Sequence, residues 1–175
     1  MADLKVAVAG AGGRMGAALI RAVVAAEGLV LHAAFDRSGS SVIGRDAGAA
    51  AGIEALEISV GDDVEAALAG ADAILDFTAP AATVALARLA AERGLVHVIG
   101  TTGCGPAEDA AIAAAARAGA RIVKSGNYSL GINVLVGLVR QAAAALPGYD
   151  VEILEMHHNR KVDAPSGTAL MLGEA

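Results

Sequence analysis

An apolar run that enters a glycine-rich turn near the N-terminus restricts the fold more than any other feature. Residues 6–9 read VAVA, residues 10–16 read GAGGRMG, and an apolar-faced helix is predicted over residues 14–26. Glycines in such a turn let backbone N–H groups approach a phosphate, because glycine adopts positive φ angles and has no Cβ. The turn is therefore predicted to be a phosphate-binding loop.

The glycine spacing departs from the usual dinucleotide fingerprint. Gly10 and Gly12 match the first half of G-x-G-x-x-G, but Met15 stands where the third glycine is expected, and Gly16 follows one residue later. A strand predicted over residues 29–35 leads to Asp36, at the distance where a Rossmann unit places the carboxylate that binds ribose hydroxyls. These features favour dinucleotide binding; the alternative is an ordinary βαβ unit with a solvated acid.

Strand and helix patterns alternate from Lys5 to Lys124. Further strands are predicted over residues 73–77, 96–99 and 122–124, and helices over residues 64–68, 80–94 and 106–119, whereas residues 38–52 resemble a loop of small residues. The alternation predicts an α/β fold with a doubly wound parallel Rossmann sheet. Apolar residues make up 55% of the chain and aromatics 2%, which is typical of buried strands covered by alanine-rich helices.

The pattern changes after Leu130. A long apolar-faced helix is predicted over residues 132–146 and a strand over residues 151–156. We place a domain boundary near Asn127. Residues 1–127 then form a dinucleotide-binding domain, and residues 128–175 form the start of an α+β substrate-binding and catalytic domain.

Charge and composition narrow the classes of partner. The net charge of −6 argues against a nucleic-acid surface, and a single cysteine allows no disulfide framework, which favours a reducing compartment. The first residues lead directly into a strand without a leader sequence, and no apolar run is long enough to span a bilayer. We therefore expect a cytoplasmic protein with no nucleic-acid or membrane partner.

A polar cluster occupies residues 155–169, which read EMHHNRKVDAPSGTA. Histidine, arginine and lysine precede a Pro-Ser-Gly-Thr turn that opens a helix, and such an arrangement favours an anion, because cations converge near helix N-terminal N–H groups. Paired histidines could instead ligate a metal, but no Cys, Asp or Glu completes a zinc pattern, so no metal site is assigned. A solvated loop is the other alternative.

Four motifs, in chain order, resemble the signatures of the 4-hydroxy-tetrahydrodipicolinate reductase family, also called dihydrodipicolinate reductases, of diaminopimelate and lysine biosynthesis. They are GAGGRMG, GTTG, SGNYS and EMHHNRKVDAPSGTA. The resemblance covers essentially the whole chain. It implies reduction of 4-hydroxy-tetrahydrodipicolinate to tetrahydrodipicolinate, with NADH and/or NADPH as cofactor and a small dicarboxylate as substrate.

The resemblance also implies roles for individual residues. The pyrophosphate would be held by Gly10, Ala11, Gly12, Gly13, Arg14 and Met15, the adenosine ribose by Asp36, and the 2′-phosphate of NADPH by Arg37. The nicotinamide side would be lined by Gly100, Thr101, Thr102, Ser125, Gly126, Asn127 and Tyr128. The catalytic pair would be His157 and Lys161, with His158, Gly167 and Thr168 binding the substrate carboxylates. A histidine is chemically suited to protonate the reduced substrate near neutral pH.

This sequence differs from the family's pattern in one respect. The family's chain continues past the helix opened by Pro-Ser-Gly-Thr, whereas this sequence ends at Ala175, so we expect an incomplete second domain. Full-length relatives are expected to be homotetramers, and that expectation does not extend to this chain. Two other functions stay open: an inactive dinucleotide-binding module, and another dehydrogenase that acts on an aspartate-derived substrate.

Overall fold

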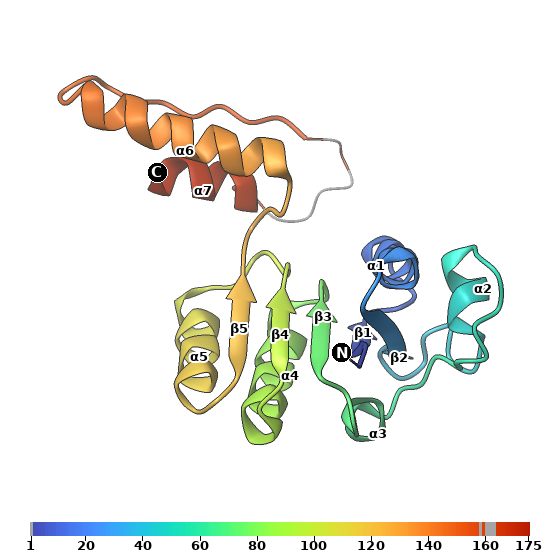
Figure 1. The fold of residues 1–175 in the computed structure, drawn as a ribbon. Coiled ribbons are helices and arrows are strands. Elements are labelled where there is room, and N and C mark those ends of the chain that lie inside the picture. Colours follow the sequence, from blue (N-terminus) through green and yellow to red (C-terminus); the bar gives the residue numbers. More distant parts are fainter. Residues whose placement is uncertain (1, 158, 160–163) are drawn as a thin grey trace.

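A five-stranded parallel sheet forms the centre of the chain. The computed structural model describes residues 2–157, 159 and 164–175. The strands lie in the order β2-β1-β3-β4-β5, and every neighbouring pair is parallel. Their bounds are β1 (Leu4–Ala9), β2 (Leu29–Phe35), β3 (Ala73–Asp76), β4 (Val96–Ile99) and β5 (Arg121–Lys124). Their carboxyl ends point to one edge, toward the last two helices (Figure 1).

Helices cover both faces of this sheet. Val6 and Val8 of β1 pack in one cluster with Ile20 of α1 (Arg14–Ala25) and with residues of α2 (Ala47–Ala51). The alternate residues of β1, Ala7 and Ala9, pack on the opposite face against α3 (Val64–Leu68) and α4 (Pro80–Arg93). The fifth helix, α5 (Pro106–Arg117), packs beside α4. The predicted doubly wound α/β fold is confirmed.

Local sequence signals account for the helix bounds in this part. Pro80 occupies the first turn of α4, and Gly94 ends that helix in the left-handed conformation with φ 65°, which is the usual asymmetry of proline and glycine. At the start of α5, the Glu108 side chain accepts a hydrogen bond from the Gly105 backbone N–H at 2.9 Å. Proline and glycine therefore place both helices within two residues of their predicted bounds.

Two predictions of local structure are wrong. The predicted loop over residues 38–52 contains α2, which begins after Asp46, because the Asp46 side chain accepts a hydrogen bond from the Ala49 N–H. The predicted strand over residues 151–156 is irregular chain. A strand needs a neighbour to satisfy its backbone groups, and none of the described residues pairs with this segment; Leu154 and Met156 are 94% and 97% exposed.

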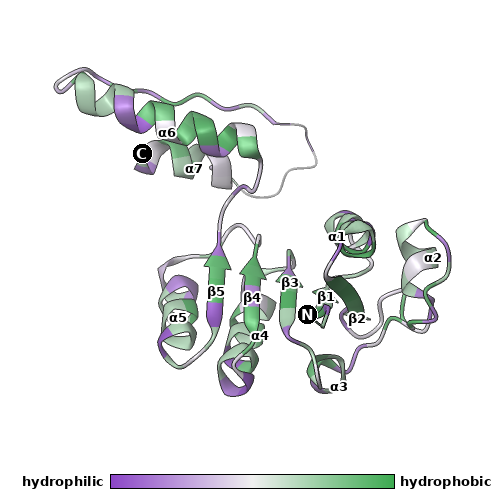
Figure 2. Ribbon diagram, in the orientation of Figure 1, coloured by the Kyte–Doolittle hydropathy of each residue, from purple (hydrophilic) through white to green (hydrophobic). Residues whose placement is uncertain are grey.

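Two further helices, α6 (Leu130–Ala145) and α7 (Gly167–Glu174), lie beyond the carboxyl ends of β4 and β5 (Figure 1). Much of α6 is hydrophobic (Figure 2), yet it has no buried residue. The helix predicted after Pro-Ser-Gly-Thr is confirmed: Ser166 caps α7 by accepting a hydrogen bond from the Ala169 N–H at 3.0 Å. Among the described residues, every helix is too short or too polar to cross a membrane.

Candidate functional site

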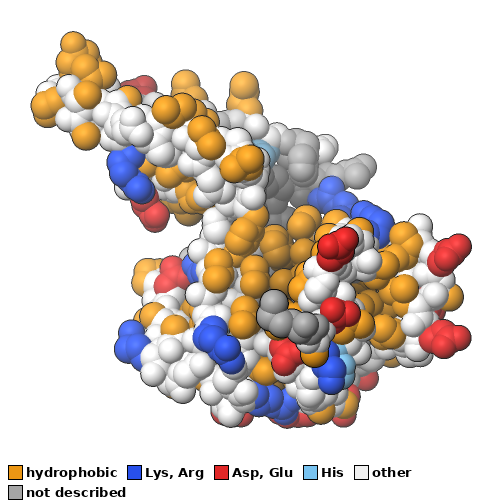
Figure 3. Space-filling model, in the orientation of Figure 1, with side chains coloured by type: hydrophobic (Ala, Val, Ile, Leu, Met, Phe, Trp, Pro, Cys, Tyr) orange, Lys and Arg blue, Asp and Glu red, His pale blue; other side chains and the backbone are white. Residues whose placement is uncertain are grey.

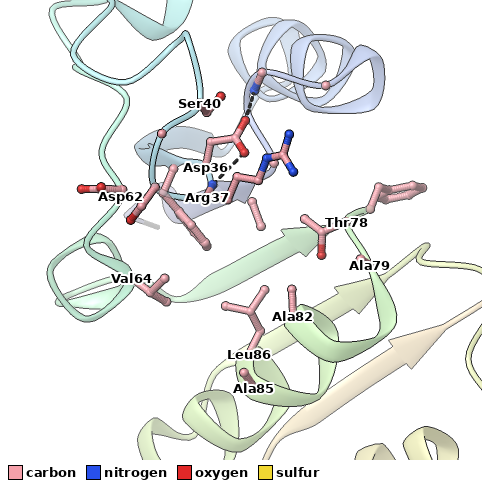
Figure 4. A pocket seen from close by; sticks show the side chains of 18 of the residues that line it. Asp36, Arg37, Ser40, Asp62, Val64, Thr78, Ala79, Ala82, Ala85 and Leu86 are labelled. Atoms are coloured by element: carbon pink, nitrogen blue, oxygen red, sulfur yellow. Dashed lines mark hydrogen bonds between the residues drawn. The ribbon is translucent and has the colours of Figure 1, made fainter.

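A groove of about 1030 Å³ opens beside the carboxyl ends of β1 and β2. Figure 4 shows that the turn after β2 forms one side of it, with Asp36 and Arg37, while the start of α4 forms the other, with Thr78 and Ala82. The glycine turn contributes Gly10, Gly12 and Gly13 to the lining. The structure therefore brings the predicted phosphate loop and the predicted ribose carboxylate to one groove.

The geometry of the glycine turn explains its unusual spacing. Gly10 has φ 72°, a left-handed conformation that favours glycine. A Cβ on Gly16 would lie 2.1 Å from the Gly10 carbonyl oxygen, so Gly16 allows α1 to pack closely on the turn. Gly13 is the N-cap and offers no side-chain acceptor. The first-turn N–H groups of Arg14 and Met15 thus have no partner within the helix or at the cap.

Asp36 holds the two sides of the turn together. Its Oδ2 accepts a hydrogen bond from the Gly12 N–H and its Oδ1 one from the Arg37 N–H, both at 2.7 Å. An ionised carboxylate has about four acceptor positions, so capacity remains for ribose hydroxyls. Ala11 differs from its neighbours, because its N–H donates to the Phe35 carbonyl at 3.1 Å and its side chain is buried; the structure places Ala11 in the core.

A second hollow, of about 550 Å³, lies at the carboxyl ends of β3 and β4. Its lining includes Met15 and five of the residues predicted for the nicotinamide side: Gly100, Ser125, Gly126, Asn127 and Tyr128. The rings of Phe77 and Tyr128 lie 5.8 Å apart. The Tyr128 hydroxyl is 2.9 Å from the Ile99 carbonyl and 3.0 Å from that of Val123, and burial raises the pKa of Tyr128. That hydroxyl is therefore held by the end of the sheet.

A third hollow, of about 330 Å³, separates the sheet edge from α7 and is lined by Thr102 and Gly167, among others. A Cβ on Gly126 would lie 2.9 Å from the Gly167 carbonyl oxygen. The absence of a side chain at both glycines therefore allows these two backbone segments to approach closely. Beside them, Asn127 Nδ2 donates a hydrogen bond to Thr168 Oγ1 at 2.8 Å. Residues predicted for the cofactor and for the substrate are thus in direct contact.

His157 is held by a residue that the sequence reasoning missed. Its Nδ1 lies 2.7 Å from Glu155 Oε2, while Glu155 Oε1 accepts a hydrogen bond from the Ser166 N–H at 2.7 Å. The only signal in the sequence was an acid two residues before a histidine. The predicted partners His158 and Lys161 lie outside the described residues. Within the described part of the chain, His, Cys, Asp and Glu form no group of three that could hold a metal.

Comparison with known protein families shows which family this chain belongs to. The family described as "Dihydrodipicolinate reductase, N-terminus" matches residues 4–128, and "Dihydrodipicolinate reductase, C-terminus" matches residues 131–175. The chain belongs to the dihydrodipicolinate reductase family. The resemblance read from the four motifs is confirmed.

Relatives in the dihydrodipicolinate reductase family are similar over almost the whole chain. The 4-hydroxy-tetrahydrodipicolinate reductase of Allorhizobium ampelinum is 58% identical over 174 residues, which cover 98% of this chain and 64% of the relative. That of Rhizobium rhizogenes is 59% identical, covering 98% and 63%. A dipicolinate-bound dihydrodipicolinate reductase from Paenisporosarcina sp. TG-14 superposes with a TM-score of 0.73 at 28% identity, covering 98% of this chain and 66% of that one. The chain thus spans slightly less than two thirds of the curated relatives' length.

Proposed function

We propose that this chain carries the reductase activity of its family: the NAD(P)H-dependent reduction of 4-hydroxy-tetrahydrodipicolinate to tetrahydrodipicolinate. One observation carries the proposal. The Glu155–His157 pair is tied through Ser166 to the N-terminus of α7, and α7 is tied through Thr168 to the sheet edge. A proton-transferring side chain is thereby connected to the edge where the groove and the second hollow open.

The groove fits a dinucleotide. The first-turn N–H groups of Arg14 and Met15 suit a pyrophosphate at the positive end of α1, and Asp36 keeps acceptor capacity for ribose hydroxyls. Arg37 lies directly beside Asp36 at the same groove, which supports acceptance of both NADH and NADPH, since a guanidinium suits a 2′-phosphate. A bound reduced nicotinamide would supply the hydride.

The Glu155 carboxylate determines which nitrogen of His157 can exchange a proton. A carboxylate only accepts hydrogen bonds, so His157 Nδ1 carries the hydrogen that faces Glu155 Oε2. Nε2 is then the nitrogen that gives a proton to the reduced substrate and takes one back from water. Lys161 is the proposed partner of His157 by resemblance to the family.

The N-terminus of α7 suits a substrate carboxylate. Ser166 Oγ already accepts a hydrogen bond from the Ala169 N–H, which leaves the first-turn N–H groups of Gly167 and Thr168 without a partner in the helix. Gly167 lines the third hollow together with Thr102, and Thr168 is the next residue. We assign this position, with His158, to a small dicarboxylate.

The test follows nicotinamide absorbance with this 175-residue chain. Substrate is generated freshly from pyruvate and aspartate semialdehyde by the preceding synthase, and NADH and NADPH are supplied in parallel. Consumption of NADH or NADPH that requires the complete substrate-generating mixture supports the proposal. Other aspartate-derived substrates are supplied in separate assays to test whether the chain is a different dehydrogenase. Asp36→Ala is the matched variant, because it removes the ribose carboxylate while keeping the residues around His157 unchanged.

A second candidate function is dinucleotide binding without turnover. The exposure of the last third favours it, since among the described residues from 121 to 175 only Ser166 is buried. Cofactor binding by fluorescence with no consumption of NADH or NADPH would establish this reading in place of the reductase.

A further inference from the structure

A buried acid and a buried histidine lie in the middle of the sheet, outside the residues assigned above. Asp76 ends β3 and His97 lies in β4, and both side chains are 0% exposed, with His97 Nε2 3.1 Å from Asp76 Oδ2. The surrounding core is built mainly of alanine, valine, leucine and isoleucine. Replacing a buried ionic pair by apolar residues is often neutral or stabilising, so packing alone does not account for this pair.

Three threonines complete a network around Asp76. Its Oδ1 accepts hydrogen bonds from the Thr78 hydroxyl at 2.6 Å and from the Thr78 N–H at 3.0 Å. The Thr101 hydroxyl lies 3.3 Å from the same oxygen, and it accepts hydrogen bonds from the Thr78 N–H at 3.0 Å and the Thr83 hydroxyl at 2.8 Å. The network joins the turn after β3 to the segment after β4.

Thr78 carries this network to the groove. Its side chain lines the groove (Figure 4), and its Cγ2 would lie 2.9 Å from a Cβ on Gly10. The threonine methyl therefore packs against the glycine turn. At the other end, Thr101 follows Gly100, which lines the second hollow. The network thus runs from Thr78, which lines the groove, to Thr101, which directly follows a residue of the second hollow.

Hydrogen bonding fixes the charge and the tautomer of the pair. Burial alone would raise the pKa of Asp76, but hydrogen bonds from His97 and Thr78 outweigh burial and lower it, so the carboxylate stays ionised. His97 Nδ1 is buried and has no hydrogen-bond partner among the described residues. A proton on Nε2, donated to Asp76, leaves no buried N–H unpaired, whereas a proton on Nδ1 would be left without an acceptor.

We propose that His97 and Asp76 are positioning residues for the dinucleotide, which act by holding Thr78 and Thr101 between the groove and the nicotinamide side. The proposal rests on the proposed function, because it assigns the groove to NADH or NADPH. Without the His97 donor, Asp76 Oδ2 is left buried and unpaired, and the carboxylate no longer has one fixed orientation in which to hold Thr78. The glycine turn then loses the fixed methyl group against which it packs.

The test compares five variants by their dissociation constants for NADH and NADPH, with unfolding followed in parallel. His97→Leu removes the donor, and His97→Gln restores an N–H donor near the position of Nε2. Ile99→Val is the matched control, because Ile99 is fully buried in the same strand and its side chain makes no hydrogen bond. Thr78→Val, alone and combined with His97→Leu, shows whether the effect of His97 passes through Thr78.

We expect His97→Leu to raise the dissociation constant roughly tenfold, with His97→Gln within about threefold of the wild type and Ile99→Val unchanged. The double variant should be no weaker than Thr78→Val alone, because one shared network is lost once. Equal effects of His97→Leu and Ile99→Val at equal loss of stability would overturn the positioning role. Additive effects of the two network variants would overturn it as well.

The wild type separates the two proposals. If it binds neither cofactor, the groove assignment itself is wrong, whatever the variants do. The tautomer of His97, read from ¹⁵N chemical shifts without any cofactor, tests the network independently. A proton on Nε2 supports it, and a proton on Nδ1 overturns it.

Discussion

The first 125 residues and the last 50 differ in how their apolar side chains are used. In the sheet region, alternate residues of β1 enter two separate buried clusters, and α1 buries Ile20 and Val23. In the last 50 residues, Leu130 is 81% and Leu138 56% exposed, and apolar side chains gather on the surface around α6 (Figure 3). The same kind of composition therefore builds a core in one region and a surface in the other.

This contrast separates the residues that fold the chain from those proposed to perform chemistry. The groove belongs entirely to the packed region, whereas Glu155 and His157 belong to the exposed one. The exposed region meets the sheet region through a few contacts, namely the Tyr128 hydroxyl with the Ile99 and Val123 carbonyls and the close approach of Gly167 to Thr102. Variants in the two regions should therefore have separable effects.

The largest effect is expected from His157→Ala in the exposed region. Loss of the proposed proton donor should lower kcat by about 10²-fold to 10⁴-fold, while the dissociation constants for NADH and NADPH stay at the wild-type values. Steady-state kinetics and cofactor titration measure the two quantities. His32→Ala, which removes a histidine of the sheet region, serves as the control. Wild-type turnover in His157→Ala would exclude it from the mechanism.

The free energy of unfolding should depend more on the sheet region than on the exposed region. Ile20→Ala creates a cavity between α1 and β1, because Ile20 is 0% exposed, and should lower the free energy of unfolding by about 2–5 kcal/mol. Leu138→Ala on α6 should change it by less than about 0.5 kcal/mol, since more than half of that side chain is already in water. Denaturant titration measures both. Equal losses would show that α6 is as well packed as α1, and would remove the contrast.

Glu155→Gln sharpens the assignment within the exposed region. The amide oxygen can still accept the Ser166 N–H, but the charged acceptor for His157 Nδ1 is lost, so kcat should fall roughly tenfold to a hundredfold. The value of kcat across pH is the informative measurement, because a residue that only supported α7 would leave its pH profile unchanged. Glu152→Gln, in the same exposed segment, is the control that should keep wild-type kcat.

The smallest effect concerns the acid stability of the sheet region. The pKa of Asp76 lies below its ordinary value of 3.8 in the folded protein. Its contribution to stability is therefore fully present above that value and is lost as the pH falls through the lower pKa of the folded state. The free energy of unfolding of the wild type should decrease below about pH 4 more steeply than that of Asp76→Asn. Parallel slopes in urea titrations across this range would contradict the expectation.

Most of the fold was predictable because it depends on local signals. The bounds of β2, α3 and β4 match the prediction residue for residue, since each is a short apolar run bounded by turn residues. The helix α2 was missed because its alanines and glycines show no periodicity, and its start depends on the Asp46 side chain, which also accepts hydrogen bonds from the N–H groups of Leu56 and Ile58. That arrangement exists only after the chain has folded.

The site was predictable in part. The glycine turn and Asp36 were recognisable from their spacing, but Met15 faces the second hollow and Ala11 enters the core. Glu155 begins the motif EMHHNRKVDAPSGTA but was given no role, and His97 lies in no motif; their contacts with Ser166 and Asp76 span 11 and 21 residues of sequence. Spacing predicts a contact only within one element or one regular unit.

The sequence by itself determined the parallel α/β sheet, the position of the glycine turn and the family, because periodicity and short motifs are local properties of the chain. Only the tertiary structure decided that residues 151–156 pair with no strand in the described part of the chain, that Glu155 faces His157, and that Asp76 joins His97 to Thr78. Each of these depends on which groups meet in space, and a hydrogen bond or a paired strand forms only where both partners are present. The physical reason is that burial and pairing depend on two segments together, whereas secondary-structure propensity is a property of a single segment.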